Sequence, residues 1–356
     1  MPDFKQLAAD LDPEGVAGFT RSFVDNLRGG LAAVTVDAYP WISDLSARSW
    51  AGVLCLGMGG SAAGGDFLAA LASDAGSAPV IVSRGYAFPS WWRDGWLVLA
   101  TSHSGNTEET LAAVTDALEA GATVVVICTG GKLADLAASH DRCHRVESVA
   151  GQPPRTAFGH LFSRQVALLR LLGILPDGPD DAAMLNRLQA ACEGHDFVSH
   201  PDVLGERMAQ LHAHPIAILG PRDLQPALTR FKNQLNENSG RFARIGAVPE
   251  MNHNEVVAWG GVGPDGDPRN GDQALILLTW AGMHARTRAR QDWIADHTPA
   301  ATTWALELAG ESLLEALLFG CIVMDWASIG LALLHGKDPV AIAPIDALKK
   351  HLASLA

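Results

Sequence analysis

The stretch Val53-Leu54-Cys55-Leu56-Gly57-Met58-Gly59-Gly60-Ser61-Ala62-Ala63-Gly64-Gly65 joins a short apolar run to a segment rich in glycine that carries one hydroxyl. An apolar run of this length bounded by glycine is typical of a buried strand, and the residues after it read as a helix. Backbone N–H groups at a helix N-terminus suit a phosphate dianion. The stretch therefore predicts an α/β domain with a phosphate-binding loop after its first strand.

A second stretch repeats this pattern further along the chain. The apolar run 96–100 is followed by Ser102-His103-Ser104-Gly105-Asn106-Thr107, which places three hydroxyls within six residues. The plainer interpretation is a capping box, in which a hydroxyl N-cap precedes the carboxylates of Glu108 and Glu109. Both interpretations can hold, because a cap uses only one hydroxyl. Two such loops suggest one phosphate held between them.

A dinucleotide site is the alternative for the first loop. Gly57-x-Gly59-x-x-Ala62 fits a loose form of that fingerprint, which requires an acidic residue about 20 positions later. The second expected strand ends instead at Arg84, a residue that could face the 2′-phosphate of NADP. This alternative leaves Gly60-Ser61 and Gly64-Gly65 unexplained.

Short apolar runs alternate with helix-length segments from Val53 onward, and this indicates parallel sheets with helices on both faces. We expect a first α/β unit, then a second cycle from Pro215, a long apolar helix from Ser312 to about His335, and a short last helix over 345–355. The predicted domains are an N-terminal helical arm (1–48) and two subdomains (49–185 and 200–356). The expected strands are 53–57, 79–83, 96–101, 123–128, 144–147, 215–220, 274–278 and 302–306, and the expected helices of the first unit are 61–74, 107–120 and 131–139.

Composition excludes several classes of protein. The 356 residues are 48% apolar and 18% charged, and the net charge of −13 argues against nucleic acid as a partner. Five scattered cysteines indicate free thiols in a reducing cytoplasm and no metal site. The N-terminus lacks the features of a signal peptide, and no run of about 18 apolar residues appears, so we expect no membrane segment.

Together these motifs resemble the sugar isomerase (SIS) domain and, more narrowly, the bifunctional phosphoglucose/phosphomannose isomerases. The resemblance runs from about residue 50 to the C-terminus. Beyond the two loops it rests on four further segments, which are Pro154-Arg155, Asn236-Glu237-Asn238, Asn252-His253-Asn254-Glu255 and Ile345-x-x-Leu348-Lys349.

The resemblance implies two SIS subdomains, each a parallel sheet flanked by helices, in a homodimer with active sites near the subunit interface. It implies a hexose 6-phosphate substrate and aldose–ketose isomerisation without metal or redox cofactor. Glu237 would be the catalytic base, Arg155 would lie over the reacting carbons, and His253 and Lys349 would assist ring opening, the histidine coming from the partner subunit. The residues that would hold the phosphate are Gly60, Ser61, Ser102, Ser104 and Thr107.

The chemistry of these residue types suits the roles. Aldose–ketose isomerisation moves a proton between C1 and C2 through a cis-enediolate, which needs one carboxylate base and a fixed cation. A plainer interpretation exists for each: Glu237 as a solvated carboxylate at a helix end, Arg155 as a surface cation, and Lys349 as a helix-end charge that Lys350 could replace. Glu255 is a rival base, although orienting His253 is the better interpretation of it.

Two departures from the family pattern bear on function. His103 occupies a place where the family has tyrosine, and we expect its side chain to point away from the phosphate. The stretch Asp338-Pro339-Val340-Ala341-Ile342 lacks the threonine associated with acceptance of both C2 epimers, which weakens the expectation of mannose 6-phosphate activity more than that of glucose 6-phosphate activity.

Other functions compete with the isomerase. One is a non-catalytic SIS module that senses a sugar phosphate, against which the presence of Glu237, Arg155 and His253 in order argues. Another is a related SIS enzyme acting on an amino sugar phosphate or a fructosamine phosphate. The NADP-dependent reductase stands last among these.

Overall fold

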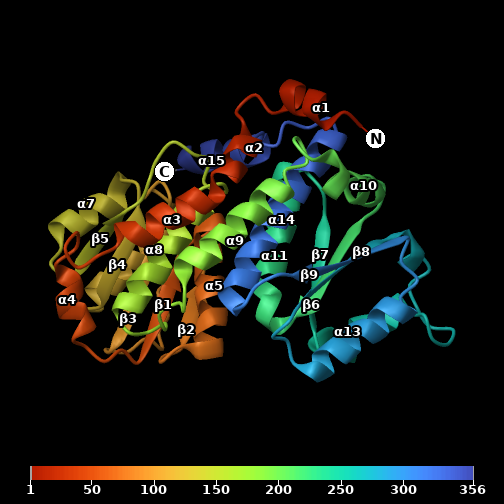
Figure 1. Cartoon of the computed structure of the whole chain (residues 1–356). Helices are drawn as coiled ribbons and strands as arrows, with labels where there is room; N and C mark the ends of the chain where they lie inside the picture. The colour runs from red at the N-terminus through yellow and green to blue at the C-terminus, as the bar shows by residue number, and fades with distance from the viewer. Residues whose placement is uncertain (1, 356) are drawn as a thin grey trace. The chain divides into compact units, whose positions relative to one another are not determined.

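The computed structural model describes residues 2–355, which form two compact units, each built on one parallel sheet (Figure 1). The first-sheet unit comprises Ser22–Gln189 and Leu313–Leu317. The second-sheet unit comprises the residues up to Arg21, Ala190–Ser312, and the residues from Leu318 onward. The predicted α/β class, with two parallel sheets flanked by helices, is confirmed. The domain boundaries drawn from the sequence stay a prediction.

The first sheet has five parallel strands in the order β2-β1-β3-β4-β5. All five predicted strands of this unit are confirmed within one residue at either end, and the three predicted helices within two. The strands are β1 (Gly52–Leu56), β2 (Val80–Ser83), β3 (Trp96–Thr101), β4 (Thr123–Cys128) and β5 (Cys143–Glu147); the helices are α3 (Phe23–Ala33), α4 (Trp41–Ser46), α5 (Gly59–Ala75), α6 (Glu108–Glu119), α7 (Gly131–Ser139), α8 (Phe158–Leu171) and α9 (Asp181–Gly194).

Helices cover both faces of this sheet. Every residue of β1 is buried, as a strand covered on both faces requires. Helix α8 packs between α3 and α5 on one face (Figure 1), whereas α6 and α7 pack on the other. Alternate strand residues, including Leu54, Val98 and Val126, form one apolar core with Val114 of α6 and Leu133 of α7. The alternation follows from the two-residue period of a strand.

The second sheet has four parallel strands in the order β7-β6-β8-β9. The three predicted strands are confirmed, and β7 is an addition that the sequence analysis missed. The strands are β6 (Ile216–Pro221), β7 (Ala243–Val248), β8 (Ala274–Trp280) and β9 (Thr302–Leu308); the helices are α1 (Phe4–Leu11), α2 (Val16–Arg21), α10 (Pro201–His212), α11 (Gln225–Asn238), α12 (Glu255–Trp259), α13 (Ala285–His297), α14 (Leu313–Leu334) and α15 (Ala343–Ala353), with 3-10 turns η1 (Arg222–Leu224), η2 (Glu250–His253) and η3 (Asn270–Asp272).

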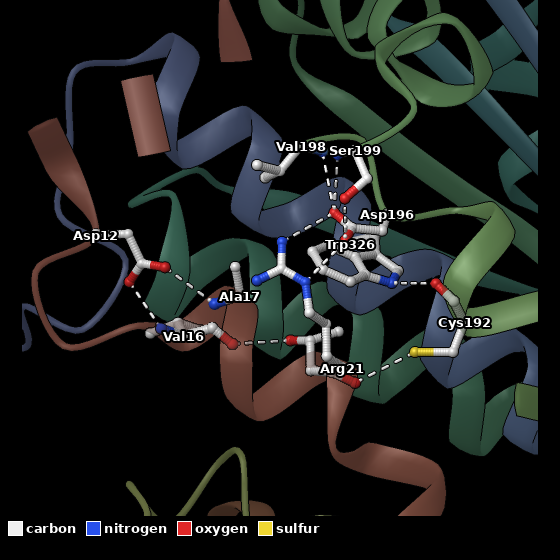
Figure 2. A network of polar contacts seen from close by, with 10 residues as sticks. Asp12, Val16, Ala17, Arg21, Cys192, Asp196, Val198, Ser199 and Trp326 are labelled. Atoms are coloured by element: carbon white, nitrogen blue, oxygen red, sulfur yellow. Dashed lines mark hydrogen bonds and ion pairs between the residues drawn. The ribbon is translucent and has the colours of Figure 1, made fainter. Parts of the chain in front are cut away.

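The N-terminal helices α1 and α2 belong to the second-sheet unit, in which polar contacts hold α2 at both ends (Figure 2). Asp12 accepts hydrogen bonds from the first two backbone N–H groups of α2, at 2.7 and 3.0 Å. At the other end of α2, Arg21 forms a two-point ion pair with Asp196, and its guanidinium lies 5.6 Å from the ring centroid of Trp326. The Trp326 indole donates to the carbonyl of Cys192. This segment is therefore held by charge and by an aromatic contact as well as by apolar packing.

Helix α14 has the length and composition of a membrane-spanning helix, with a mean hydropathy of 2.1 over its most apolar window. In the folded chain 89% of that window is buried. A helix that is apolar on all sides and buried is a core helix of a large protein. The helix predicted from Ser312 to about His335 is confirmed. Glu315 and Asp325 interrupt it, so the sequence contains no unbroken run of 18 apolar residues although the helix is apolar on average.

Candidate functional site

Both hydroxyl-bearing loops lie at the carboxyl edge of the first sheet, between β1 and β3. These two strands are neighbours, and the chain turns from β1 toward β2 in one direction and from β3 toward β4 in the other. The loop with Ser61 follows β1, and the loop with Ser102 follows β3. Such a change in strand order leaves a crevice at the carboxyl ends of the strands, where ligands bind in open α/β sheets. The topology therefore brings together the two motifs that the sequence placed 41 residues apart.

A network of hydrogen bonds joins the two loops. The backbone N–H of His103 donates to Ser61 Oγ at 3.3 Å. Ser102 Oγ and Thr107 Oγ1 are 2.8 Å apart, and the N–H of Gly105 donates to Ser102 Oγ at 3.1 Å. Thr107 is the N-cap residue of α6, but its side chain caps no helix N–H. The capping-box interpretation is therefore wrong, because the Thr107 hydroxyl bonds within the loop instead.

Exposure divides the predicted phosphate ligands into two groups. Ser104 is exposed, and Ser61 and Thr107 are half-buried, so none of these three residues is enclosed by the protein. Ser102 is 0% exposed and already forms two hydrogen bonds within the loop, so it stabilises the loop conformation in this structure.

Gly105 has φ +69°, and a Cβ there would lie 1.8 Å from a backbone oxygen of the next loop. Only glycine fits this turn.

Arg155 is a buried residue, 6% exposed, and not the surface cation of the plainer interpretation. Its backbone passes beside the start of α5. A Cβ built on Gly60 would lie 3.6 Å from the carbonyl oxygen of Pro154 and 3.7 Å from Cα of Arg155. The first-sheet unit therefore collects five predicted phosphate-binding residues and Arg155 at one edge.

The remaining glycines of the first loop serve packing. A Cβ on Gly64 would lie 2.1 Å from Gln165 Oε1 of α8, and one on Gly65 would lie 2.9 Å from the Cβ of a strand residue.

Arg84, the residue on which the NADP alternative rested, forms a 2.5 Å ion pair with Asp66 of α5. The pKa of Asp66 is nevertheless raised, because its burial outweighs the nearby guanidinium. The Arg84 side chain is thus engaged by the protein itself.

Glu237 lies in the last turn of α11, a helix that is firmly held within the second-sheet unit. Residues at positions 230, 234 and 238 form one stripe of α11 and bond to α14. Arg230 and Gln234 bond to Asp325, and the amide of Asn238 donates to a serine hydroxyl of α14 at 2.9 Å. This stripe fixes the rotation of the helix and hence the position from which Glu237 projects.

Lys337 is a residue that the sequence analysis missed. Its Nζ donates to the backbone carbonyls of Glu237 at 2.6 Å and of Asn238 at 2.9 Å. The last carbonyls of a helix lack partners within the helix, and a cation there also offsets the negative end of the helix dipole. Lys337 therefore stabilises a helix end at which the carboxylate of Glu237 is electrostatically disfavoured.

Lys349 and Lys350, the two lysines that the sequence offers for ring opening, are both exposed on α15.

His253 is exposed at the end of η2, which follows β7. Glu255 does not orient it. The Glu255 carboxylate accepts from Arg244 and from the indole of Trp259 at 3.1 Å, and the Arg244 guanidinium lies 4.6 Å from the Trp259 ring centroid. The interpretation of Glu255 as the partner of His253 is therefore wrong, since Glu255 anchors α12 to β7.

Glu237 and His253 lie at opposite edges of the second sheet. Helix α11 begins after the carboxyl end of β6 and runs back for 14 residues, which is about 20 Å. Glu237 is at its far end, where β7 starts, and the six residues of β7 return over about 20 Å to η2. Within one chain the structure does not bring the predicted base and the predicted histidine together.

Comparison with known proteins gives consistent results. A model of the bacterial phospho-glucose isomerase C-terminal SIS domain matches residues 205–352. The bifunctional phosphoglucose/phosphomannose isomerase of Caldicellulosiruptor bescii is 32% identical over 314 residues, an alignment that covers 85% of this chain and 90% of the relative. The D-glucosamine-6-phosphate 4-epimerase of Sulfolobus acidocaldarius is 32% identical over 165 residues, 46% of this chain and 50% of the relative.

Among solved structures, the C-terminal domain of glucosamine-fructose-6-phosphate aminotransferase from Francisella tularensis superposes with a TM-score of 0.73 at 13% identity. The superposition covers 91% of this chain and 97% of that one, so the two proteins share the fold. The sequence match to the Caldicellulosiruptor enzyme covers well over two thirds of both chains at more than 30% identity. The chain belongs to the family of bifunctional phosphoglucose/phosphomannose isomerases.

Proposed function

We propose that this chain is an aldose–ketose isomerase that interconverts fructose 6-phosphate and glucose 6-phosphate. The observation that carries the proposal is the pair of hydroxyl-bearing loops at the switch point of the first sheet, with the backbone of Arg155 beside Gly60. Hydroxyls on residues that are not buried, together with helix N-termini, suit a phosphate dianion. The name of the Caldicellulosiruptor relative supports a hexose phosphate as the owner of that phosphate.

In the proposed mechanism Ser61, Ser104 and Thr107 bind the phosphate. Glu237 moves a proton between C1 and C2, and Arg155 stabilises the negative charge of the cis-enediolate, which exceeds that of the bound substrate. Ring opening requires a group that moves a proton at O5 or at the anomeric hydroxyl, a role for His253. We assign the second ring-opening group to Lys349.

We further propose a homodimer in which His253 serves the active site of the partner copy. The argument is the separation of about 20 Å between the edge that carries Glu237 and the edge that carries His253. A proton-transfer group must lie within hydrogen-bond reach of its substrate atom, about 3 Å. One chain does not meet this condition with both residues in the arrangement described, so we assign the histidine of each site to a second copy.

We propose glucose 6-phosphate as the principal aldose and a lower rate with mannose 6-phosphate. The residues 338–342 lack the threonine that the family resemblance associates with acceptance of both epimers at C2. The five free cysteines, all buried, support the cytoplasm as the compartment of this reaction. The ratio of the two kcat/KM values measures the preference between epimers directly.

An amino sugar phosphate is the second candidate substrate. The match to a D-glucosamine-6-phosphate 4-epimerase over 165 residues favours it. Turnover of glucosamine 6-phosphate at a higher kcat/KM than that of fructose 6-phosphate would replace the first proposal by this one.

The decisive experiment incubates the purified chain with fructose 6-phosphate and no added cofactor, and follows glucose 6-phosphate by NMR. We expect turnover by the wild type, loss of turnover in Glu237→Gln, and unchanged turnover in Glu206→Gln, a matched change at an exposed carboxylate of α10. Binding of the substrate without turnover by the wild type would identify a sensor. A requirement for NADPH would exclude the isomerase.

Mixing variants tests the shared site. Glu237→Gln and His253→Ala dimers are each expected to be inactive, and their mixture is expected to recover part of the activity after subunit exchange. Recovery requires that one subunit supply the glutamate and the other the histidine. No recovery, in a mixture shown to contain mixed dimers, would place both residues in the site of one subunit.

A further inference from the structure

His103 connects four segments of the first-sheet unit. Its backbone N–H donates to Ser61 Oγ, and its carbonyl accepts from the N–H and the hydroxyl of Thr129 at 3.0 and 2.8 Å. Its ring Nε2 lies 3.1 Å from the carbonyl oxygen of Gln152. That carbonyl can only accept, so Nε2 carries the proton and donates. The side chain therefore bonds to the segment that leads to Arg155.

The surroundings of the ring keep it neutral and in this tautomer. Burial lowers the pKa of His103, and the bond to Gln152 opposes that shift only in part. Beyond it, the Gln152 amide lies 3.0 Å from Nε2 of His160, and the pKa of His160 is lowered to about 4 by burial and then by the cation of Arg164. Two neutral imidazoles are thus joined through one glutamine, His103 through the backbone carbonyl of Gln152 and His160 through its side-chain amide.

This connection leads to Arg155 by a short path. Two residues separate Gln152 from Arg155, and both are prolines, whose fixed φ angles limit the ways in which the segment can move. The carbonyl of the first proline is bonded by the N–H and the hydroxyl of Thr156, both at 2.9 Å. The chain between Gln152 and Arg155 is therefore short and conformationally restricted.

We propose that His103 is a positioning residue that fixes Arg155 relative to the bound phosphate, an inference that rests on the isomerase function proposed above. The same residue contacts Ser61 through its backbone and the Arg155 segment through its ring. The remote phosphate thereby orients the guanidinium at the reacting carbons, which is how binding energy far from the chemistry increases kcat.

Under this proposal, a change of the His103 side chain lowers kcat and leaves KM nearly unchanged. His103→Leu removes the ring bond but retains the backbone N–H that contacts Ser61. We expect KM for fructose 6-phosphate to change less than threefold, while kcat falls by about 10- to 100-fold, the scale of a 1 Å misplacement of a catalytic group. His103→Gln places an amide nitrogen near the position of Nε2 and is expected to restore most of kcat. His140→Leu, the same chemical change at the end of α7, serves as the control.

Partial unfolding would also lower kcat, so two further measurements are needed. Isothermal titration with inorganic phosphate is expected to give the same stoichiometry for the wild type and His103→Leu. In a double-mutant cycle, His103→Leu is expected to lower kcat less than twofold in an Arg155→Gln background, because a residue that acts through Arg155 has no effect once Arg155 is gone.

The outcomes distinguish the two proposals. A wild-type chain that does not isomerise fructose 6-phosphate overturns the proposed function itself. An active wild type with a His103→Leu variant of equal kcat overturns only the role of His103. Equal losses in the wild-type and Arg155→Gln backgrounds also overturn it, because His103 would then act independently of Arg155.

Discussion

The buried ion pair between Arg230 and Asp325 provides the sharpest test of how α11 is held. The two side chains are 7% and 10% exposed, and the two terminal guanidinium nitrogens, Nη1 and Nη2, donate to the carboxylate at 2.8 and 2.7 Å. Gln234 donates to the same carboxylate at 2.9 Å. Because this cluster joins α11 to α14, it fixes the helix that ends at Glu237.

Arg230→Met leaves the Asp325 carboxylate buried with only the Gln234 bond. Removal of one partner of a buried pair costs about 3–5 kcal/mol. The control is Arg28→Met, which breaks a pair whose side chains are 46% and 70% exposed and should cost about 0–1 kcal/mol. The double variant Arg230→Met/Asp325→Leu removes both charges, and we expect it to regain most of the lost stability.

The sign of the pH dependence gives a second readout. Burial raises the pKa of Asp325, and Arg230 is the main group that lowers it. Without Arg230 the folded-state pKa rises further above the unfolded value, so the folded variant binds the extra proton. Its stability relative to the wild type therefore improves as the pH falls from 7 toward the unfolded pKa near 4.

Urea denaturation followed by circular dichroism, at pH 7 and pH 5, measures these differences. An Arg230→Met penalty at pH 7 no larger than that of Arg28→Met would refute the reasoning. So would a penalty that grows on acidification.

Three further predictions concern the loops, the buried histidine and the helix end. In steady-state assays, Ser104→Ala and Thr107→Val should each raise KM for fructose 6-phosphate about 10- to 100-fold, with a smaller effect on kcat. This factor corresponds to the loss of one charge-assisted hydrogen bond to the phosphate. An unchanged KM would show that the hydroxyl does not bind the phosphate. The lowered pKa of His160 means that, between about pH 6.5 and 4, the unfolded chain binds a proton that the folded chain does not. The free energy of unfolding of the wild type therefore decreases as the pH is lowered through this window, and the amount by which it exceeds that of His160→Asn decreases with it. A difference in unfolding free energy that stays constant with pH would contradict this. Lys337→Met should destabilise the end of α11 by about 1 kcal/mol and reduce amide protection at Glu237 in hydrogen exchange, whereas unaltered protection would show that the cap is dispensable.

The first sheet could be predicted almost completely because its strands are short, apolar and separated by glycines. Strand β7 could not. Its sequence, Ala243-Arg244-Ile245-Gly246-Ala247-Val248, contains an arginine and a glycine, and both reduce the apolar signal of a strand. Tertiary contacts explain the exception. Arg244 pairs with Glu255, and a Cβ on Gly246 would lie 2.6 Å from a leucine of β6, so the glycine permits close packing.

The candidate site was predictable where function depends on local motifs, and not where it depends on distant partners. The two hydroxyl loops form contiguous patterns, whereas the burial of Arg155 and the bond from His103 to Gln152 join segments 49 residues apart. Lys337 was missed for the same reason, since nothing local to it indicates that it caps a helix 99 residues earlier. The prediction that Glu255 orients His253 was wrong because Glu255 bonds to Arg244 and Trp259 and not to the histidine near it in sequence.

The most direct test of the proposed reaction is the NMR spectrum of fructose 6-phosphate incubated in D₂O with the wild-type chain and with Glu237→Gln. A cis-enediolate intermediate predicts formation of glucose 6-phosphate by the wild type, with some deuterium at C2, and none by the variant. Formation of the aldose at equal rates by both proteins would contradict the role of Glu237. A wild-type chain that forms no glucose 6-phosphate and exchanges no deuterium would contradict the isomerase account as a whole.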